Sequence, residues 1–269
     1  MEITATGIFS SVEEIRRKAP LVHNITNYVV MNTTANALLA LGASPVMAHA
    51  IEEVEDMVAL SGALVVNIGT LSRSWVESML RAAHRAKERG TPVVFDPVGA
   101  GATVYRTAVA QEITSAVCPE IIRGNASEII ALAGDQGATR GVDSTATAGM
   151  AVDAARRLST QYGSVVSISG ETDYIIDGPR TVQVQNGHAL MTRVTGLGCC
   201  ATALSGAFVC VNGSMGTAAS QAMAVMGIAG EMAFERCEGP GTLQLHFLDT
   251  LHTMGLNDIE RRLKVSVTS

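Results

Sequence analysis

A glycine-rich segment followed by a thiol is the part of this chain whose residue types most directly indicate chemistry. Residues 194–201 read VTGLGCCA and lead into an apolar stretch with helical character. Glycines at the start of a helix let backbone N–H groups turn toward an anion, and the helix N-terminus adds partial positive charge. The thiol of Cys199 would stand beside that anion. The segment therefore indicates a phosphate or oxyanion site, although a tight strand-to-helix turn would need the same glycines.

Three other interpretations of this segment can be weighed from the sequence. Gly196 to Ala201 matches the dinucleotide-binding pattern G-x-G-x-x-G/A, but that pattern needs an acidic residue about 20 positions later, and none occurs between Gly187 and Glu231. The chain has no G-x-x-x-x-G-K-[ST], which excludes a P-loop. The third interpretation is a cysteine hydrolase, because a helix N-terminus lowers a thiol pKa. His188 is then the nearest histidine in sequence to act as the base.

Two carboxylates stand where an α/β fold could use them to hold a ligand. Asp96 directly follows the apolar run PVVF, at the position where α/β sheets place ligands. A turn-forming aspartate before a proline is the alternative. Asn125 and Glu128 open an expected helix and have the spacing of a capping box, which the spacing alone favours. A magnesium role for Glu128, direct or through water, is the other interpretation.

Polar residues near the N-terminus form a further candidate. Residues 23–28 (HNITNY) precede an apolar helix and either line a pocket or cap that helix. Met47 and His49 follow another apolar run, where such side chains belong to the core or to the rim of a site.

The elements that must position these residues alternate along most of the chain. Short apolar runs indicate buried strands and amphipathic stretches indicate helices. The alternation predicts an α/β fold with a central, mainly parallel sheet and helices on both faces. A glycine–proline turn at 178–180 predicts one short antiparallel hairpin. No linker-like stretch interrupts the pattern, so we expect one domain over residues 1–269. The predicted strands are 63–68, 92–95, 120–123, 164–169, 174–177 and 181–185, and the predicted helices are 72–89, 107–117, 125–133, 146–161, 199–211, 217–234 and 243–254.

Composition narrows the class of partner. The net charge of −6 and a pI near 5.5 argue against nucleic acid and anionic membrane surfaces. Five cysteines without a C-x-x-C spacing fit neither a zinc site nor a disulfide framework and favour a reducing cytosol. The N-terminus lacks a signal-peptide pattern, and the apolar run 201–211 is too short to span a bilayer. We expect a soluble, cytoplasmic protein with a small-molecule substrate.

Six stretches, taken together, resemble the hydroxyethylthiazole kinase family of the ribokinase-like superfamily. They appear in the family's order and extend from about residue 21 to residue 251, nearly the whole chain. The stretches are HNITNYVVMNTTANALLALGASPVMAHA, LVVNIGTL, PVVFDPVGAGAT, IIRGNASEI, NGHALMTRVTGLGCCATALSGAF and GPGTLQLHFLD.

The resemblance implies a ribokinase-like fold and transfer of the ATP γ-phosphoryl group to the primary hydroxyl of 4-methyl-5-(2-hydroxyethyl)thiazole, in thiamine salvage. Met47 and Gly196 match the family's thiazole-binding positions. Arg123 matches an ATP-binding arginine, and Ser169 stands where the family usually has a nucleotide-binding threonine. The family also implies a homotrimer with active sites between subunits, so that segments near Asn27 and Met47 would meet Cys199 across an interface.

Asp96 and Glu128 match positions at which related kinases hold Mg²⁺ on the phosphates. Cys199 matches a position that is an aspartate base in most ribokinase-like enzymes and a cysteine in this family. A thiol is a poor match for deprotonating an alkanol. The resemblance therefore places most of the catalysis in charge stabilisation by the backbone around Gly198, with Arg123 and Mg²⁺. Leu197 and Cys200 depart from the family pattern without disturbing the glycines.

Two rival functions remain open at this point. A hydroxymethylpyrimidine kinase would share the fold and the ATP chemistry, but it normally keeps an aspartate at the position of Cys199. A non-catalytic binder of thiazole or nucleotide would keep the pocket and lose the catalytic set.

Overall fold

The computed structural model describes residues 3–135 and 144–268. Within them, nine strands form one sheet in the order β2-β1-β3-β4-β5-β6-β7-β8-β9. Neighbouring strands from β2 to β6 are parallel, and those from β6 to β9 are antiparallel. The strands are β1 (Leu21–Ile25), β2 (Ser44–Val46), β3 (Ala63–Asn67), β4 (Val93–Asp96), β5 (Ile121–Asn125), β6 (Val165–Ser169), β7 (Asp173–Asp177), β8 (Arg180–Val184) and β9 (Val265–Thr268).

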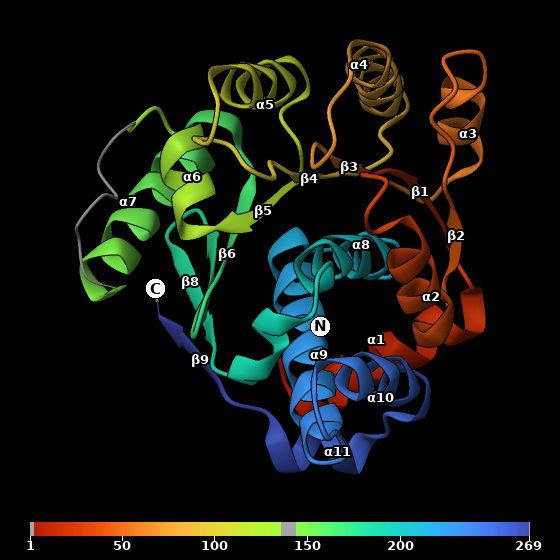
Figure 1. The fold of residues 1–269 in the computed structure, drawn as a ribbon, viewed down its shortest axis with the longest axis vertical. Helices are drawn as coiled ribbons and strands as arrows, with labels where there is room; N and C mark the ends of the chain where they lie inside the picture. Colours follow the sequence, from red (N-terminus) through yellow and green to blue (C-terminus); the bar gives the residue numbers. More distant parts are fainter. Residues whose placement is uncertain (1–2, 136–143, 269) are drawn as a thin grey trace.

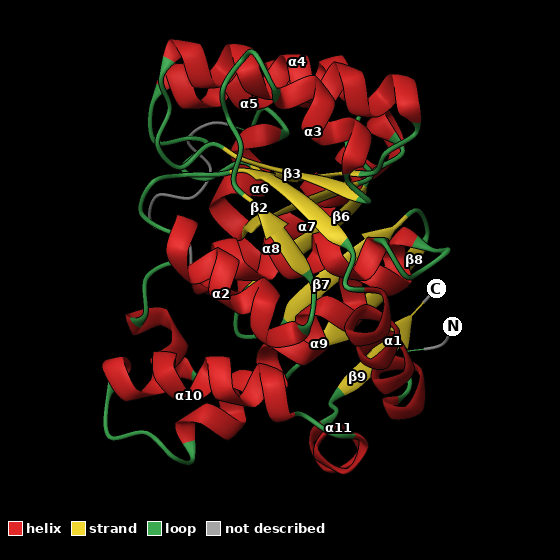
Figure 2. Cartoon of the chain, turned by 90° about the vertical axis from the view of Figure 1, so that its right-hand side faces the viewer, coloured by secondary structure: helices red, strands yellow, loops and turns green. Residues whose placement is uncertain are grey.

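Helices cover both faces of this sheet (Figures 1 and 2). A hydrophobic cluster packs the first group against one face, and a second cluster packs the other group against the opposite face. The first group is α3 (Val54–Leu60), α4 (Arg73–Arg89), α5 (Val104–Val117), α6 (Ala126–Leu132) and α7 (Ser144–Tyr162). The second group is α1 (Ala5–Lys18), α2 (Met31–Leu41), α8 (Leu197–Val209), α9 (Met215–Phe234), α10 (Pro240–Thr253) and α11 (Leu256–Arg262), with the short 3₁₀ turn η1 (Ala189–Arg193) before α8.

Helix α8 is buried along nearly its whole length between the sheet and helices α2 and α9. Its sequence, LGCCATALSGAFV, is rich in small residues, so the backbone can approach the sheet closely. No side chain caps its start at Gly196, so the N–H groups of its first turn have no side-chain acceptor at the cap. This burial makes α8 the element that fixes the glycine segment.

The predicted fold class is confirmed, and the ends of the six predicted strands lie within one residue of those observed, except that β5 ends at Asn125, two residues later than predicted. The hairpin is β7–β8. Five helix starts were predicted two or three residues too late, those of α5, α7, α8, α9 and α10. Helix α5 begins at Val104, because Thr103 caps it, and α10 begins at Pro240, because proline needs no N–H partner in a first turn. Helix α8 begins at Leu197, so Gly198 and Cys199 lie inside its first turn.

Two further sequence predictions concern the extent of the domain and membrane-spanning helices. The predicted single domain included residues 1–2, 136–143 and 269, which lie outside the described residues, and it stays a prediction. Across the described part of the chain, every helix is too short or too polar to cross a membrane.

Candidate functional site

The carboxyl ends of the parallel strands bring the candidate side chains to one edge of the sheet. Asn27 follows β1, Asn67 ends β3, Asp96 ends β4 and Ser169 ends β6. Strand β1 lies between β2 and β3, so the chain moves in opposite directions on the two sides of β1. Open α/β sheets bind ligands outside the strand ends at such a switch point.

A buried chain of hydrogen bonds crosses this edge and ends at the thiol. Asn67 and Asp96 are paired in register, and Asn67 Nδ2 donates to Asp96 Oδ2 at 2.8 Å. Asn27 Nδ2 donates to Asn67 Oδ1 at 2.8 Å and lies 3.6 Å from Cys199 Sγ. Asn27 therefore meets Cys199 within one chain, and the expectation that it would do so across a subunit interface is wrong. Thr202, one turn into α8, donates to Asp96 Oδ2 at 2.7 Å. Asp96 Oδ1 is buried without a partner among the described residues.

Burial dominates the electrostatics of these groups. It raises the pKa of Asp96 to about 7, although the Arg123 charge acts in the opposite direction. Burial, together with the Asp96 charge, raises the pKa of Cys199 to about 11. The thiol is therefore neutral at pH 7, against the lowered pKa that a cysteine nucleophile needs. His188 is engaged elsewhere: its Nδ1 accepts from Leu190 N at 3.1 Å and its ring stacks on Phe234.

The start of α8 places positive charge next to an arginine. Gly196 has φ +89° and caps the helix without a side-chain bond, and a Cβ there would lie 2.9 Å from Val30 Cγ1. A Cβ on Gly198 would lie 2.9 Å from Arg123 Nη1, so the guanidinium rests against the first turn of α8. Arg123 Nη2 donates to Ser169 Oγ at 2.6 Å. A guanidinium held against a helix N-terminus forms a site suited to an anion.

A cavity of about 810 Å³ opens beside this pair. Its volume lies in the range of about 300–1,000 Å³ that is typical of small-molecule sites. Asp173 lines it, and burial raises the pKa of this carboxyl to about 6. The lining combines Arg123, Ser169 and Gly198 with the apolar side chains of Met191, Leu197, Ala201, Met223 and Met226.

Glu128 is held by the backbone. Its Oε1 accepts from Gly99 N at 2.9 Å and its Oε2 from Asn125 N at 2.8 Å, while Asn125 Oδ1 accepts from Glu128 N. The capping box expected from the spacing is therefore present. Within the described ranges, no three His, Cys, Asp or Glu side chains cluster as a metal site. Mg²⁺ commonly uses one or two carboxylates with waters and phosphates, so the unpartnered Oδ1 of Asp96 fits it as a direct ligand, and Glu128 fits only through water.

The residues expected to bind the thiazole lie outside the cavity. Neither Met47 nor Gly196 is part of its lining. Met47 directly follows β2, at the edge of the sheet, and is partly buried. The rings of Tyr28 and His49 each pack against Trp75, with centroids 4.5 Å apart. Tyr28 is 62% exposed, so this side of the edge is open in the single chain.

Asn67 and Thr202 contribute to the site and were not singled out from the sequence. Asn67 ends the apolar run ALVVN, and the rule that selected Asp96 after PVVF would have selected it too. Thr202 lies three residues after Cys199 on the same helix and gives no signal until α8 is placed over β4.

Known proteins match this chain over almost its full length. The model of the hydroxyethylthiazole kinase family matches residues 12–257. This chain belongs to that family. A protein of Syntrophus aciditrophicus called hydroxyethylthiazole kinase is 62% identical over 266 residues, which is 98% of each chain.

Solved structures agree with the family in fold. The structure of a hydroxyethylthiazole kinase protein from Pyrococcus horikoshii OT3 has a TM-score of 0.91 and 44% identity, over 98% of this chain and 100% of that one. A ribokinase-like superfamily protein from Enterococcus faecalis has a TM-score of 0.62 and 14% identity, over 89% and 87%, and shows the fold alone. The chain is thus a phosphotransferase of the hydroxyethylthiazole kinase family, with a ribokinase-like fold.

Proposed function

We propose that this enzyme transfers the γ-phosphoryl group of ATP, with Mg²⁺, to the primary hydroxyl of 4-methyl-5-(2-hydroxyethyl)thiazole. The product would supply the thiazole phosphate used in thiamine salvage. The observation that carries this proposal is the meeting of Arg123 and the α8 N-terminus at the edge of an 810 Å³ cavity, with Cys199 and Asp96 beside them. Family membership supports the choice of thiazole as acceptor.

The nucleotide is proposed to bind in the cavity. Arg123 pairs with the phosphates and is itself oriented by its bond to Ser169. The first-turn N–H groups near Gly198 point their partial positive charge at the same oxygens. The apolar side chains of the cavity, Met223 and Met226 among them, suit a nucleobase and ribose.

Asp96 and Glu128 are the residues proposed to hold Mg²⁺. Asp96 would bind directly through Oδ1, because Asn67 and Thr202 already occupy Oδ2. Glu128 would act through a water, because both its oxygens accept backbone N–H groups. The ion, when bound, neutralises charge on the phosphate oxygens.

The chemical step needs positioning more than a strong base. The thiazole hydroxyl oxygen forms a bond to the γ-phosphorus while the bond from that phosphorus to ADP breaks, and the hydroxyl proton passes to a phosphoryl oxygen or to solvent as the new bond forms. With its pKa raised to about 11, Cys199 stays a thiol at pH 7 and orients the hydroxyl rather than removing its proton beforehand. The α8 N–H groups and Arg123 stabilise the charge that develops.

The thiazole is proposed to bind on the open side, at Met47 and Gly196. Tyr28 and Val29 are 62% and 64% exposed there. We propose that neighbouring subunits of a homotrimer cover this side, and that the enzyme works in the cytoplasm. Light scattering of the purified protein tests the assembly: a trimer is expected, and a monomer that turns over thiazole would contradict it.

The direct test is ADP release by the purified protein with Mg-ATP, measured with the thiazole, with hydroxymethylpyrimidine and with neither. Thiazole-dependent release with formation of a phosphate monoester is expected. Turnover with the pyrimidine alone would replace the acceptor, and omission of Mg²⁺ should abolish turnover. Absence of turnover with both alcohols, in a protein that binds ATP, would favour the non-catalytic binder.

A further inference from the structure

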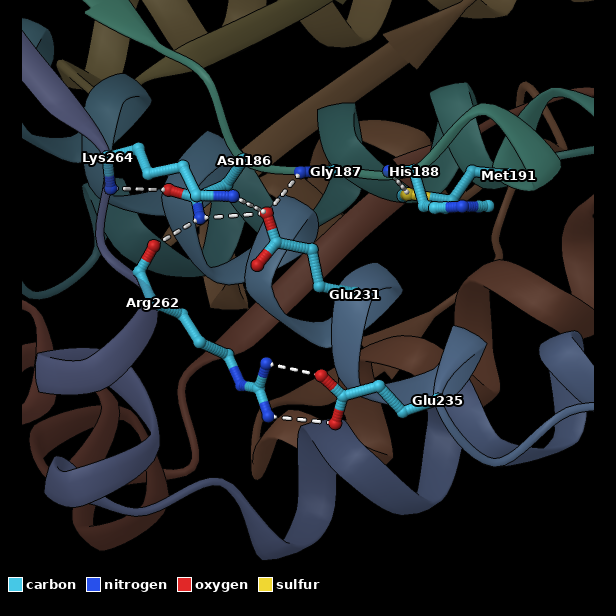
Figure 3. A network of polar contacts seen from close by, with 8 residues as sticks. All are labelled: Asn186, Gly187, His188, Met191, Glu231, Glu235, Arg262 and Lys264. Carbon is cyan, nitrogen blue, oxygen red and sulfur yellow. Dashed lines mark hydrogen bonds and ion pairs between the residues drawn. The ribbon is translucent and has the colours of Figure 1, made fainter.

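One wall of the cavity is hydrogen-bonded to helix α9 through a single carboxylate oxygen. The wall is residues 185–188, between β8 and η1. Oε1 of Glu231, on α9, accepts from Asn186 Nδ2 and Gly187 N, both at 3.1 Å, and from Lys264 Nζ at 3.0 Å (Figure 3). The Glu231 side chain is only 13% exposed.

Asn186 also forms hydrogen bonds to the C-terminal segment. Its Nδ2 also donates to Arg262 O at 2.7 Å, and its Oδ1 accepts from Lys264 N at 2.9 Å. Gln185 N donates to Lys264 O at 2.9 Å. A Cβ on Gly227 would lie 2.6 Å from Asn186 backbone atoms, so the wall packs directly on the α9 backbone. The wall is thus held by α9 on one side and by the segment leading into β9 on the other.

These hydrogen bonds affect the shape of the cavity, because the residues that they hold line it. Asn186, Gly187 and His188 all face the cavity. Without the Glu231 carboxylate, the Gly187 N–H and one Asn186 donor bond would lose their acceptor in a mostly buried place. Leaving a buried donor without an acceptor is unfavourable, so the wall would shift to find water or another partner.

Glu235 provides a natural comparison one turn further along α9. It binds the Arg262 guanidinium through two bonds, at 2.7 and 2.9 Å (Figure 3). It is 55% exposed, and its carboxylate pairs with Arg262. The two glutamates therefore connect the same helix to the same C-terminal segment, but only Glu231 contacts the cavity wall.

We propose that Glu231 is a positioning residue for the nucleotide: by fixing Asn186 and Gly187 it sets the shape of the cavity wall. The proposal rests on the assignment of this cavity to ATP. Glu231 touches neither the transferred group nor the acceptor hydroxyl. Its loss is expected to weaken nucleotide binding and to leave the chemical step nearly unchanged.

The test compares ADP affinity by calorimetry and the steady-state constants of wild type, Glu231→Ala, Glu231→Gln and Glu235→Ala. Glu231→Ala should weaken ADP binding and raise the KM for ATP about tenfold, equivalent to about 1.4 kcal/mol. Its kcat and its KM for the thiazole should stay within about twofold of wild type. Glu231→Gln, which keeps an accepting oxygen for Gly187, should recover most of the affinity, and Glu235→Ala should match wild type.

Each failure has a different meaning. If wild type binds no adenine nucleotide, the assignment of the cavity is wrong and this inference fails with it. If wild type binds ADP and Glu231→Ala binds it equally well, the positioning role is wrong while the proposed function stands. An equal loss in Glu235→Ala would assign the effect to general loosening of the C-terminal segment and would also overturn the role. If Glu231→Ala does not fold, Glu231→Gln carries the test: an affinity lowered about twofold to threefold supports the role, and a loss as large in kcat as in affinity contradicts it.

Discussion

The two sides of the α8 N-terminus differ in how much of a binding site one chain supplies. On the cavity side, Arg123 is 8% exposed, is oriented by Ser169 and lines a cavity of about 810 Å³. On the acceptor side the floor is equally buried, with Asn27 4% exposed, but Tyr28 above it is 62% exposed. One chain supplies the residues proposed to bind the phosphate donor. On the side proposed to bind the alcohol, one chain supplies buried residues at the base of the site, while the residues at its entrance are exposed.

This difference follows from what each side must do. Stabilising charge on a transferred phosphoryl group needs donors that are fixed before the reaction, and burial fixes them. Recognising an alcohol needs mainly a shaped surface, which a second subunit can supply. The α8 glycines lie between the two sides. Substitutions of these glycines, substitutions on the acceptor side and substitutions on the cavity side should therefore have separable effects.

Gly198→Val should have the largest effect, because Gly198 is one of the α8 glycines that lie between the cavity side and the acceptor side. A Cβ at this position would lie 2.9 Å from Arg123 Nη1, so the branched side chain must displace the guanidinium from Ser169. We expect kcat/KM to fall by about 10²–10³, the range for loss of one preorganised donor to developing charge. Steady-state kinetics measure it. Gly213→Ala is the matched control, since a Cβ there meets nothing within 4 Å and activity should be unchanged.

Cys199→Ser should have a much smaller effect on the acceptor side. The serine hydroxyl can keep the contact with Asn27, and a neutral hydrogen bond contributes only about 0.5–1.5 kcal/mol. The kcat should therefore fall less than about tenfold. A loss in kcat as large as that of Gly198→Val would contradict the assignment of the catalysis to charge stabilisation rather than to the thiol.

Asp173→Asn should change stability on the cavity side in a defined pH window. Burial raises the pKa of Asp173 to about 6, above the value of about 3.9 for an unfolded chain. Between these values the folded state binds a proton that the unfolded state has lost, so this group's contribution to the unfolding free energy falls as pH rises through about 4 to 6. The asparagine variant should be more stable than wild type by about 3 kcal/mol at pH 7, with a difference that shrinks toward pH 4.

Urea unfolding at several pH values measures that difference. A gap between the two proteins that stays constant from about pH 4 to pH 7 would show that Asp173 does not titrate in this window.

The sequence predicted most of the sheet because its central strands are apolar on both faces. Runs such as 63–67 and 93–96 carry that signal without ambiguity. Strand β1 was not predicted because His23 and Asn24 interrupt it, and in the fold both are buried, with His23 Nε2 2.8 Å from Ala48 O. Strand β9 lies at the sheet edge with mostly exposed residues, so its pairing to β8 leaves no burial pattern to detect.

The capping box beside the candidate site was predictable from the sequence, but the hydrogen-bond network of the site was not. The spacing of Asn125 and Glu128 predicted the capping box, yet only the fold brings Gly99 to the second carboxylate oxygen. The bond between Asn67 and Asp96 depends on strand register, which the sequence does not specify for parallel neighbours. The raised pKa of Cys199 likewise comes from burial under other elements, whereas the local helix start alone suggested a lowered one.

The most direct test of the central claim is a paired measurement of both Michaelis constants in Ser169→Ala and Met47→Ala. Ser169 orients Arg123 on the cavity side, and Met47 lies on the open side. We expect Ser169→Ala to raise the KM for ATP about threefold to tenfold with an unchanged KM for the thiazole, and Met47→Ala to do the reverse. If both variants change the same constant, the two substrates do not bind on opposite sides of α8, and the account is wrong.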